Sequence, residues 1–229
     1  MPTSVRLKLE CVPRVLGYFR RHPELLCAAA QKAVGRLERL AERTRALFGI
    51  KLRAQGELSA ATAERDGCAG PLLELLAQVV GLARAAALHE GDAELGAALR
   101  FGSLTRLIPL ERARAALDTA LRSAELLNRY GMPEGMLEEL GDVLGRYAAA
   151  AERRAAAIEA IAAANAELEL LAQEGLLVIR HLDALNRIRL AGHPEKRAEW
   201  REARSVRWGK SGAGKATEVE GASPTSQGV

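Results

Sequence analysis

The stretch that decides the fold runs from Pro133 to Leu190 and reads PEGMLEELGDVLGRYAAAAERRAAAIEAIAAANAELELLAQEGLLVIRHLDALNRIRL. Its apolar residues recur at alternating spacings of three and four, which place them on one side of a helix. They form three rows, each stepping by seven: Leu137, Leu144, Ala151, Ile158, Asn165, Ala172, Ile179 and Asn186; Leu140, Tyr147, Arg154, Ile161, Leu168, Gly175, Leu182 and Arg189; and Val143, Ala150, Ala157, Ala164, Leu171, Val178 and Leu185. Three rows are wider than the seam of a two-stranded coil. The stretch therefore predicts one very long helix, about 133–190, buried in a bundle.

The composition favours an all-α fold. Hydrophobic residues make up 48% of the 229 residues, yet only 3% are aromatic, so the apolar mass is mostly Ala and Leu. Both are good helix formers, whereas strands favour β-branched and aromatic residues. We predict an antiparallel bundle of about four main helices, with short terminal helices and a disordered C-terminal tail.

The remaining elements follow from breaks in the helical pattern. Gly131-Met132-Pro133 is a helix–turn–helix signal, because Gly suits the residue after a helix and Pro the first turn of the next. The segment Gly67–Pro71 either breaks or kinks a helix. The expected helices cover residues 4–20, 24–66, 72–89, 92–99, 109–130 and 195–206, with 100–108 as the longest connection. The predicted domains are a short helical segment at 1–22, the bundle at 23–208 and the disordered tail at 209–229.

Three polar residues interrupt the predicted seam. Asn165 is either a residue that sets helix register or one that lines a pocket. Asn186, beside Arg187, is expected where the seam reaches solvent, and Arg154 either extends to the surface or marks the end of the bundle.

The sequence contains no recognisable catalytic, cofactor or metal-binding motif. None of the four histidines has a Glu three residues before it, as an inward-facing Glu-x-x-His metal motif requires, and there is no Gly-x-Ser-x-Gly motif. Cys11, Cys27 and Cys68 have no zinc spacing, so they are expected to be free thiols in a reducing compartment. No segment approaches the ~18 uncharged apolar residues that a membrane span needs, and no signal peptide is evident. A cytoplasmic location is expected.

The segment Gly209–Ala216 has the glycine and lysine spacing of a phosphate-binding P-loop. Its last position holds Ala216, whereas a P-loop needs Ser or Thr there to hold magnesium. It also follows Trp208 rather than a strand, and a Pro- and Ser-rich tail follows it. We interpret this segment as a flexible linker.

Positive charge is concentrated near the C-terminus. Between Arg180 and Lys215, ten Lys and Arg residues accompany four Asp and Glu, although the whole chain carries only +4. Alternating arginine and aromatic residues can bind nucleic acid or an anionic membrane surface. Alternatively, the acids and bases of residues 195–204 pair on a solvated helix while Trp200 packs on the bundle end. The residues singled out for contact with nucleic acid or a partner are Arg197, Trp200, Arg201, Arg204, Arg207 and Trp208.

From Phe101 to Trp208 the chain resembles an uncharacterised group of Ala- and Arg-rich bacterial helical-bundle proteins. The residues that carry the resemblance are Gly131-Met132-Pro133 with Leu137 and Leu140, Leu182-Asp183-Ala184, and Trp200, Ala203, Val206 and Arg207. Asn186 and Ile188 stand where the group has a more basic run. The resemblance implies a helical bundle in bacteria and implies no activity.

Two functions remain. The leading hypothesis is a non-enzymatic structural or protein-interaction module that uses its long helices to associate with itself or with a partner. The alternative is a nucleic-acid-binding accessory protein that works through the basic segment 180–215.

Overall fold

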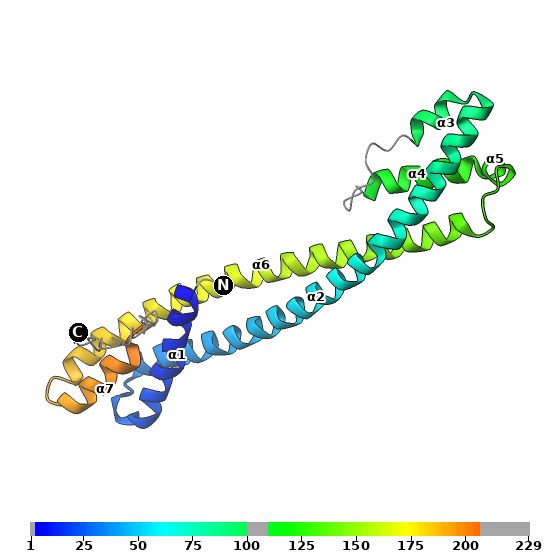
Figure 1. Ribbon diagram of the computed structural model, residues 1–229. Helices are drawn as coiled ribbons and strands as arrows, with labels where there is room; N and C mark the ends of the chain where they lie inside the picture. Colours follow the sequence, from blue (N-terminus) through cyan, green and yellow to red (C-terminus); the bar gives the residue numbers. More distant parts are fainter. Residues whose placement is uncertain (1–2, 100–109, 207–229) are drawn as a thin grey trace, which may run out of the picture. The chain divides into compact units, whose positions relative to one another are not determined.

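The computed structural model describes residues 3–99 and 110–206, and within them every regular element is a helix (Figure 1). The all-α prediction is confirmed. In chain order the elements are α1 (Thr3–Arg21), the 3-10 turn η1 (Pro23–Leu25), α2 (Ala28–Glu90), α3 (Ala93–Ala98), α4 (Leu110–Arg122), α5 (Ala124–Arg129), α6 (Met136–Arg189) and α7 (Pro194–Arg204). The connection expected at 100–108 and the tail expected at 209–229 lie outside the described residues.

Helix α6 confirms the very long helix, with 54 residues from Met136 to Arg189. It is preceded by two glycines at positive φ, Gly131 at +87° and Gly135 at +80°. Only glycine adopts this backbone without a steric penalty, so these two residues allow the turn that precedes α6.

Helix α2 differs from the expectation at its start, and in its middle it follows one of the two alternatives left open at Gly67–Pro71. It begins at Ala28 rather than near Glu24, because Pro23–Leu25 forms the separate turn η1. It then continues through Gly67–Pro71 to Glu90, so Pro71 lies inside a 63-residue helix and does not break it. Buried residues on both sides of the proline, Cys68 and Leu72, anchor the helix by packing there.

Of the shorter elements, the helix expected at 92–99 is confirmed as α3, capped at Asp92 and Leu99, and the one expected at 109–130 is not continuous. The helix expected at 109–130 is divided at Ser123 into α4 and α5. The short helix α3 begins after Asp92, whose side-chain oxygen accepts a hydrogen bond from the Leu95 amide at 3.0 Å. This is the N-cap geometry that satisfies an otherwise unpaired amide of the first turn.

By its contacts the chain forms two compact units, and each is described by itself. Unit 1 comprises Met1–Ala41 and Leu171–Val229, and its described part contains α1, η1, the start of α2, the end of α6, and α7. Its core is an apolar cluster around three aromatic rings, Tyr18, Phe19 and Trp200, each at most 3% exposed. The sequence-based domain division at residues 22 and 208 stays a prediction.

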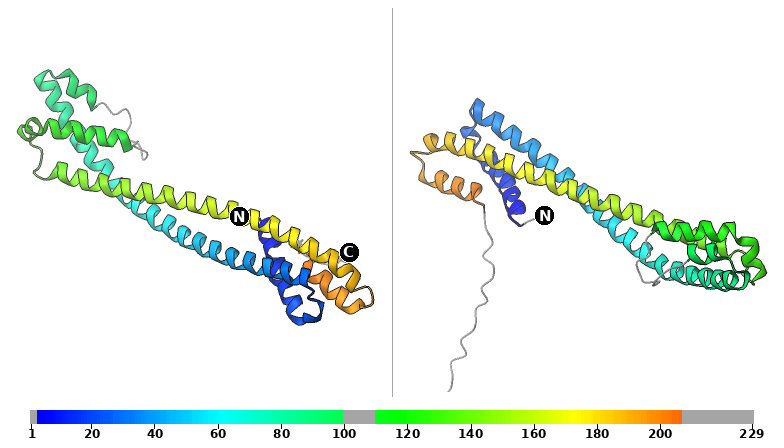
Figure 2. Two further views of the ribbon diagram at one scale, coloured as in Figure 1. Left: turned by 180° about the vertical axis from the view of Figure 1, so that it is seen from behind. Right: turned by 90° about the horizontal axis from the view of Figure 1, so that it is seen from above.

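Unit 2 comprises Glu42–Leu170. At one end, the apolar faces of α2 and α6 share a core with α3, α4 and α5. Away from that core, α2 and α6 run side by side in opposite directions (Figures 1 and 2), linked by Arg43–Glu167, Lys51–Asn165 and Glu64–Arg153. The residues buried in this stretch are Leu47, Ala54 and Ala61 on α2, and Ala148, Ala150, Ala157, Ala164 and Leu168 on α6. Alanine lets two helices approach closely.

The expectation that three rows of α6 are buried is wrong in this stretch. Ile158 is 42% exposed, and Ala151 and Ile161 are half-buried. Within unit 2, α2 is the one described helix beside this part of α6, and a single neighbour does not cover all three rows. The Ala150–Ala157–Ala164 row is buried throughout, whereas the row of Ile161 is buried here only at Leu168.

Helix α2 contains an 18-residue window that is long and apolar enough to cross a membrane, which corrects the expectation that no segment comes close. Of that window, 44% is buried. The apolar run after Pro71 includes Leu72, Leu76 and Val79, which are buried in the core of unit 2. A core helix has the same length and composition as a span, so the window alone does not distinguish the two.

Candidate anion-binding pocket between α6 and α7

A pocket of about 360 Å³ lies between the end of α6 and α7, within unit 1. Each helix lines it with residues at spacings of three, four and seven, which place them on one face. From α6 these are Asp183, Asn186, Arg187 and Leu190; from α7 they are Arg197, Trp200, Arg201 and Arg204.

Trp200 fixes α7 against the core. Its ring lies 5.2 Å from that of Tyr18 and 5.6 Å from that of Phe19, centroid to centroid. Its indole N–H donates a 2.9 Å hydrogen bond to Asp183 Oδ1. At 3% exposure the ring packs on the end of the bundle, as one of the sequence-based alternatives predicted, and its face is not open for stacking on a base.

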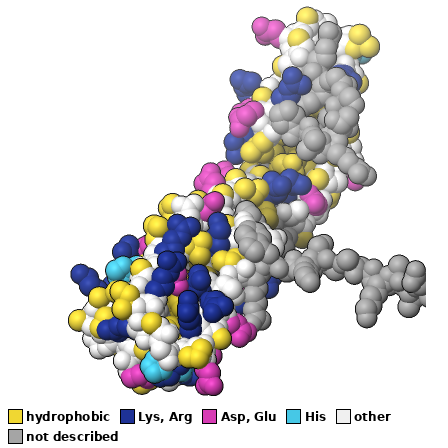
Figure 3. Space-filling model, turned by 90° about the vertical axis from the view of Figure 1, so that its left-hand side faces the viewer, with side chains coloured by type: hydrophobic (Ala, Val, Ile, Leu, Met, Phe, Trp, Pro, Cys, Tyr) yellow, Lys and Arg dark blue, Asp and Glu magenta, His cyan; other side chains and the backbone are white. Residues whose placement is uncertain are grey.

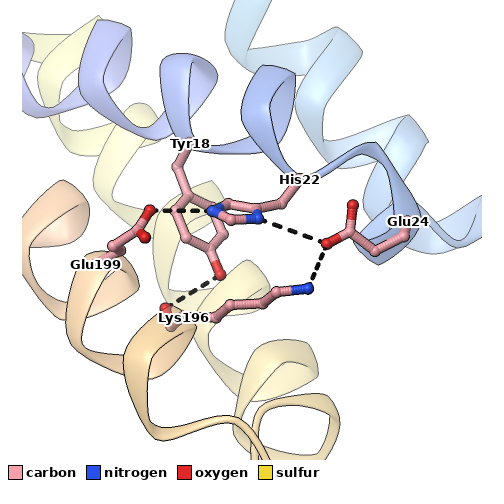
Figure 4. Close-up of polar contacts among 5 residues, drawn as sticks. All are labelled: Tyr18, His22, Glu24, Lys196 and Glu199. Atoms are coloured by element: carbon pink, nitrogen blue, oxygen red, sulfur yellow. Dashed lines mark hydrogen bonds and ion pairs between the residues drawn. The ribbon is translucent and has the colours of Figure 1, made fainter.

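A polar network on the other side of α7 ties it to α1 and η1 (Figure 4). The His22 ring lies between two carboxylates, with Nε2 3.0 Å from Glu199 and Nδ1 3.5 Å from Glu24. Lys196 Nζ lies 2.6 Å from Glu24, and the Tyr18 hydroxyl donates to the Lys196 carbonyl at 3.2 Å. The contacts hold α7 at a fixed position, and with it one wall of the pocket.

This network shifts three pKa values. Burial, followed by the nearby carboxylates, raises the pKa of Tyr18 to about 12. The hydrogen bond from Lys196 lowers the pKa of Glu24, and the hydrogen bond from His22 lowers that of Glu199. Both carboxylates therefore stay charged at neutral pH.

Four guanidinium groups surround the pocket, but only two of them have a carboxylate within reach. Asp183 lies 3.2 Å from Arg204 Nε and 3.5 Å from Arg187. The Arg204 Nε–H is at ion-pair distance from Asp183, yet it is buried without a hydrogen-bond acceptor. Arg197 and Arg201 make no hydrogen bond or ion pair with any described residue. The pocket lining therefore has an excess of three positive charges.

Asn186 contributes an unpaired amide to the same lining. It is 1% exposed, and neither its Nδ2 nor its Oδ1 has a hydrogen-bond partner among the described residues. The expectation that the seam reaches solvent at Asn186 is therefore wrong. Asn165, in contrast, is half-buried and accepts a 3.0 Å hydrogen bond from Lys51, which links α6 to α2.

The structure brings together four of the six residues singled out from the sequence. Arg197, Trp200, Arg201 and Arg204 line the pocket, whereas Arg207 and Trp208 lie outside the described residues. Sequence reasoning missed Asp183, Asn186, Arg187 and Leu190. The spacing of these residues in the sequence places them on one face of α6. That face meets α7 only because the chain turns at Gly192 and folds α7 back onto α6.

The pairing expected within residues 195–204 is largely replaced by contacts to other elements. Lys196 pairs with Glu24, Glu199 with His22 and Arg204 with Asp183. The acids of α7 are thus drawn toward α1, while arginines line its other side. Figure 3 shows Lys and Arg side chains gathered on one face of the molecule.

Comparison with known proteins gives no relative: no protein-family model, no curated protein and no solved structure matches the chain. Within residues 3–99 and 110–206, no group of three or more His, Cys, Asp or Glu could hold a metal ion.

Proposed function

We propose that this protein is a non-enzymatic interaction protein that pairs with a second copy of itself through α2 and α6 of unit 2. The observation that carries the proposal is an apolar strip left uncovered beside the α2–α6 contact. This open seam consists of Phe48 on α2 and of Ala151, Arg154, Ile158 and Ile161 on α6. Phe48 and Ile158 are 40% and 42% exposed.

The open seam lies on one side of the helix pair. Phe48 shares a helix face with Lys51, three residues later, and Lys51 reaches across to Asn165. Asn165 in turn belongs to the same seven-residue row as Ala151 and Ile158. Both helices therefore contribute to a single surface.

A helix is the element that fits this surface. The row of Ile158 continues to Leu144 and Leu137, which are buried in a core shared with Ala113, Ala116 and Ala120 of α4. Beyond that core the row keeps its seven-residue period without a described helix to cover it. A seven-residue apolar period is the pattern that packs against another helix in a coiled coil or bundle.

A second copy supplies such a helix without a further component. In a two-fold contact the open seam of each chain covers that of the other, and the four long helices form one bundle. Full burial of a side chain such as Ile or Phe contributes about 1.5–3 kcal/mol.

Sedimentation of the full chain over a wide concentration range tests the proposal. We expect the wild type to be a dimer and Ile158→Asp to be a monomer, since a buried unpaired charge opposes association. Leu170→Asp is the matched control, because Leu170 is 64% exposed on α6 and lies nine residues from Ile161, on the opposite side of the helix from the open seam. Helical content is checked by circular dichroism for every variant. A wild type that stays monomeric throughout contradicts self-association.

The second candidate, nucleic-acid binding through residues 180–215, is favoured by the arginines of the pocket. Its test is binding of an oligonucleotide across a salt series, where log affinity falls with log salt by roughly 0.9 per phosphate contacted in duplex DNA. Deleting α7 would remove Trp200 from the core, so Arg197→Gln with Arg201→Gln is the sharper variant. We also propose that the protein is located in the cytoplasm of a bacterial cell.

A further inference from the structure

We propose that the pocket between α6 and α7 binds a small phosphate monoester that carries a neighbouring hydroxyl group. The juxtaposition that supports this is two unpaired arginines, Arg197 and Arg201, beside the buried and unpaired amide of Asn186. The site lies in unit 1, apart in the chain from the open seam of unit 2, so either proposal can fail without the other.

The charge distribution indicates an anionic ligand. Arg197, Arg201 and Arg204 follow one another at spacings of four and three on α7, and like charges at these spacings repel. Asp183 pairs with Arg204 and Arg187, and it is already held by the Trp200 N–H. Arg197 and Arg201 therefore have no carboxylate partner and are available to bind an anionic ligand.

A phosphate suits this set of donors better than a carboxylate. Guanidinium groups bind phosphate oxygens in pairs of parallel hydrogen bonds. Here the guanidinium groups come from two helices, with Arg187 on α6 and the others on α7. A tetrahedral phosphate presents oxygens in several directions, whereas the two oxygens of a carboxylate lie in one plane. The excess of three positive charges in the lining is sufficient to neutralise a doubly charged monoester.

Asn186 specifies the rest of the ligand. Its amide can donate two hydrogen bonds and accept two, and it makes none within the described residues. A phosphate oxygen satisfies the donor but cannot satisfy Oδ1. A hydroxyl group beside the phosphate supplies the missing donor, so the amide recognises the two groups together.

The pocket favours a compact ligand over a nucleic-acid strand. Its volume of about 360 Å³ lies in the usual range for small-molecule sites. Single-strand binding combines a charged groove with exposed aromatic faces on which successive bases stack. The aromatic ring in this lining, Trp200, is buried against Tyr18 and Phe19 instead.

Calorimetric titration of the full chain tests the assignment with four probes. Glycerol 3-phosphate carries both groups, propyl phosphate lacks the hydroxyl, glycerate replaces the phosphate by a carboxylate, and an oligothymidylate offers phosphodiesters. We expect the affinity for glycerol 3-phosphate to be at least about tenfold higher than that for propyl phosphate or glycerate. Each analogue lacks one of the two groups and leaves a polar group of the pocket without a partner, which strongly weakens binding. Equal affinity for propyl phosphate overturns the hydroxyl assignment, and tighter binding of the oligonucleotide at matched phosphate concentration overturns the small-ligand assignment. Absence of binding by all four overturns the site.

Three variants locate the binding. Arg197→Gln with Arg201→Gln should weaken glycerol 3-phosphate binding by about a hundredfold, as two charge-assisted contacts are lost. Asn186→Leu should reduce the preference for glycerol 3-phosphate over propyl phosphate to about twofold or less, because it removes the partner of the hydroxyl, while loss of the amide donor to the phosphate weakens both ligands alike. Arg180→Gln is the control, because Arg180 lies on α6 outside the pocket lining. The affinity of this variant for glycerol 3-phosphate should equal that of the wild type. An equal loss in the control indicates nonspecific charge attraction and contradicts the proposal. Circular dichroism confirms folding of each variant.

Discussion

Removing the Trp200 ring should destabilise unit 1 more than any surface substitution. The ring is 3% exposed and contacts the rings of Tyr18 and Phe19. Truncating a buried Trp to Ala costs about 3–5 kcal/mol, from lost transfer free energy and the cavity left behind. We therefore expect Trp200→Ala to lower the free energy of unfolding by that amount.

A second variant separates the packing from the hydrogen bond. Trp200→Phe keeps most of the ring but deletes the N–H that donates to Asp183 at 2.9 Å. A hydrogen bond to a charged group is worth about 1.5–3 kcal/mol, and the lower end applies because Asp183 retains two arginine partners. Trp200→Phe should therefore cost about half as much as Trp200→Ala.

Urea unfolding followed by far-UV circular dichroism measures both losses. The control is Ile188→Ala, on α6 and 83% exposed, which should change the free energy of unfolding by less than about 0.5 kcal/mol. The reasoning is refuted if Trp200→Ala costs less than about 1 kcal/mol, since the ring would then contribute no core packing.

Three further predictions concern the cysteines, acid stability and two glycines. A backbone N–H at the start of α2 and a nearby arginine lower the pKa of Cys27, whereas burial raises that of Cys11, so single-cysteine variants titrated with iodoacetamide should show Cys27 reacting at lower pH. The pKa of Glu199 is lower in the folded than in the unfolded state, so its charged carboxylate stabilises the fold at neutral pH, and this contribution is lost as the pH falls below about 4.5. The wild type should therefore lose stability in that range faster than Glu199→Gln does. Parallel pH profiles of the two proteins would exclude this role. Gly145→Ala, with nothing within 4 Å of the added Cβ, should raise the free energy of unfolding by about 0.5–1 kcal/mol. Gly175→Ala, whose Cβ would lie 3.2 Å from a Val12 methyl, should gain less or lose stability, and an equal gain in urea unfolding would show that the contact relaxes freely.

Much of the fold could be predicted from the sequence because its signals are local. The heptad rows and the Gly131 turn were sufficient to place α6 within three residues at its start and one at its end. The sequence left open whether the helix breaks at Pro71; packing of Cys68 and Leu72 keeps α2 continuous there despite the helix-breaking tendency of a proline. The apolar pattern also predicted burial for Ile158, but such a pattern does not reveal how many neighbouring helices are present to cover the residue.

The candidate site was only half visible in the sequence. The concentration of positive charge near the C-terminus identified Arg197, Arg201 and Arg204. It did not identify Asn186 on a different helix, because the two faces meet only after the chain reverses between α6 and α7. The assignment of Trp200 to the core rather than to a ligand likewise required the positions of Tyr18 and Phe19, which lie far away in the chain.

The sequence by itself determined that this protein is helical, where its longest helix lies, and which residues of α7 share a face. Those properties depend on backbone propensity and on the 3.6-residue repeat, and both act between near neighbours in the chain. Only the tertiary structure decided which apolar rows are covered, which arginines lack a carboxylate, and that an unpaired amide lies among them. These properties depend on contacts between distant segments, whose formation the helical repeat does not encode.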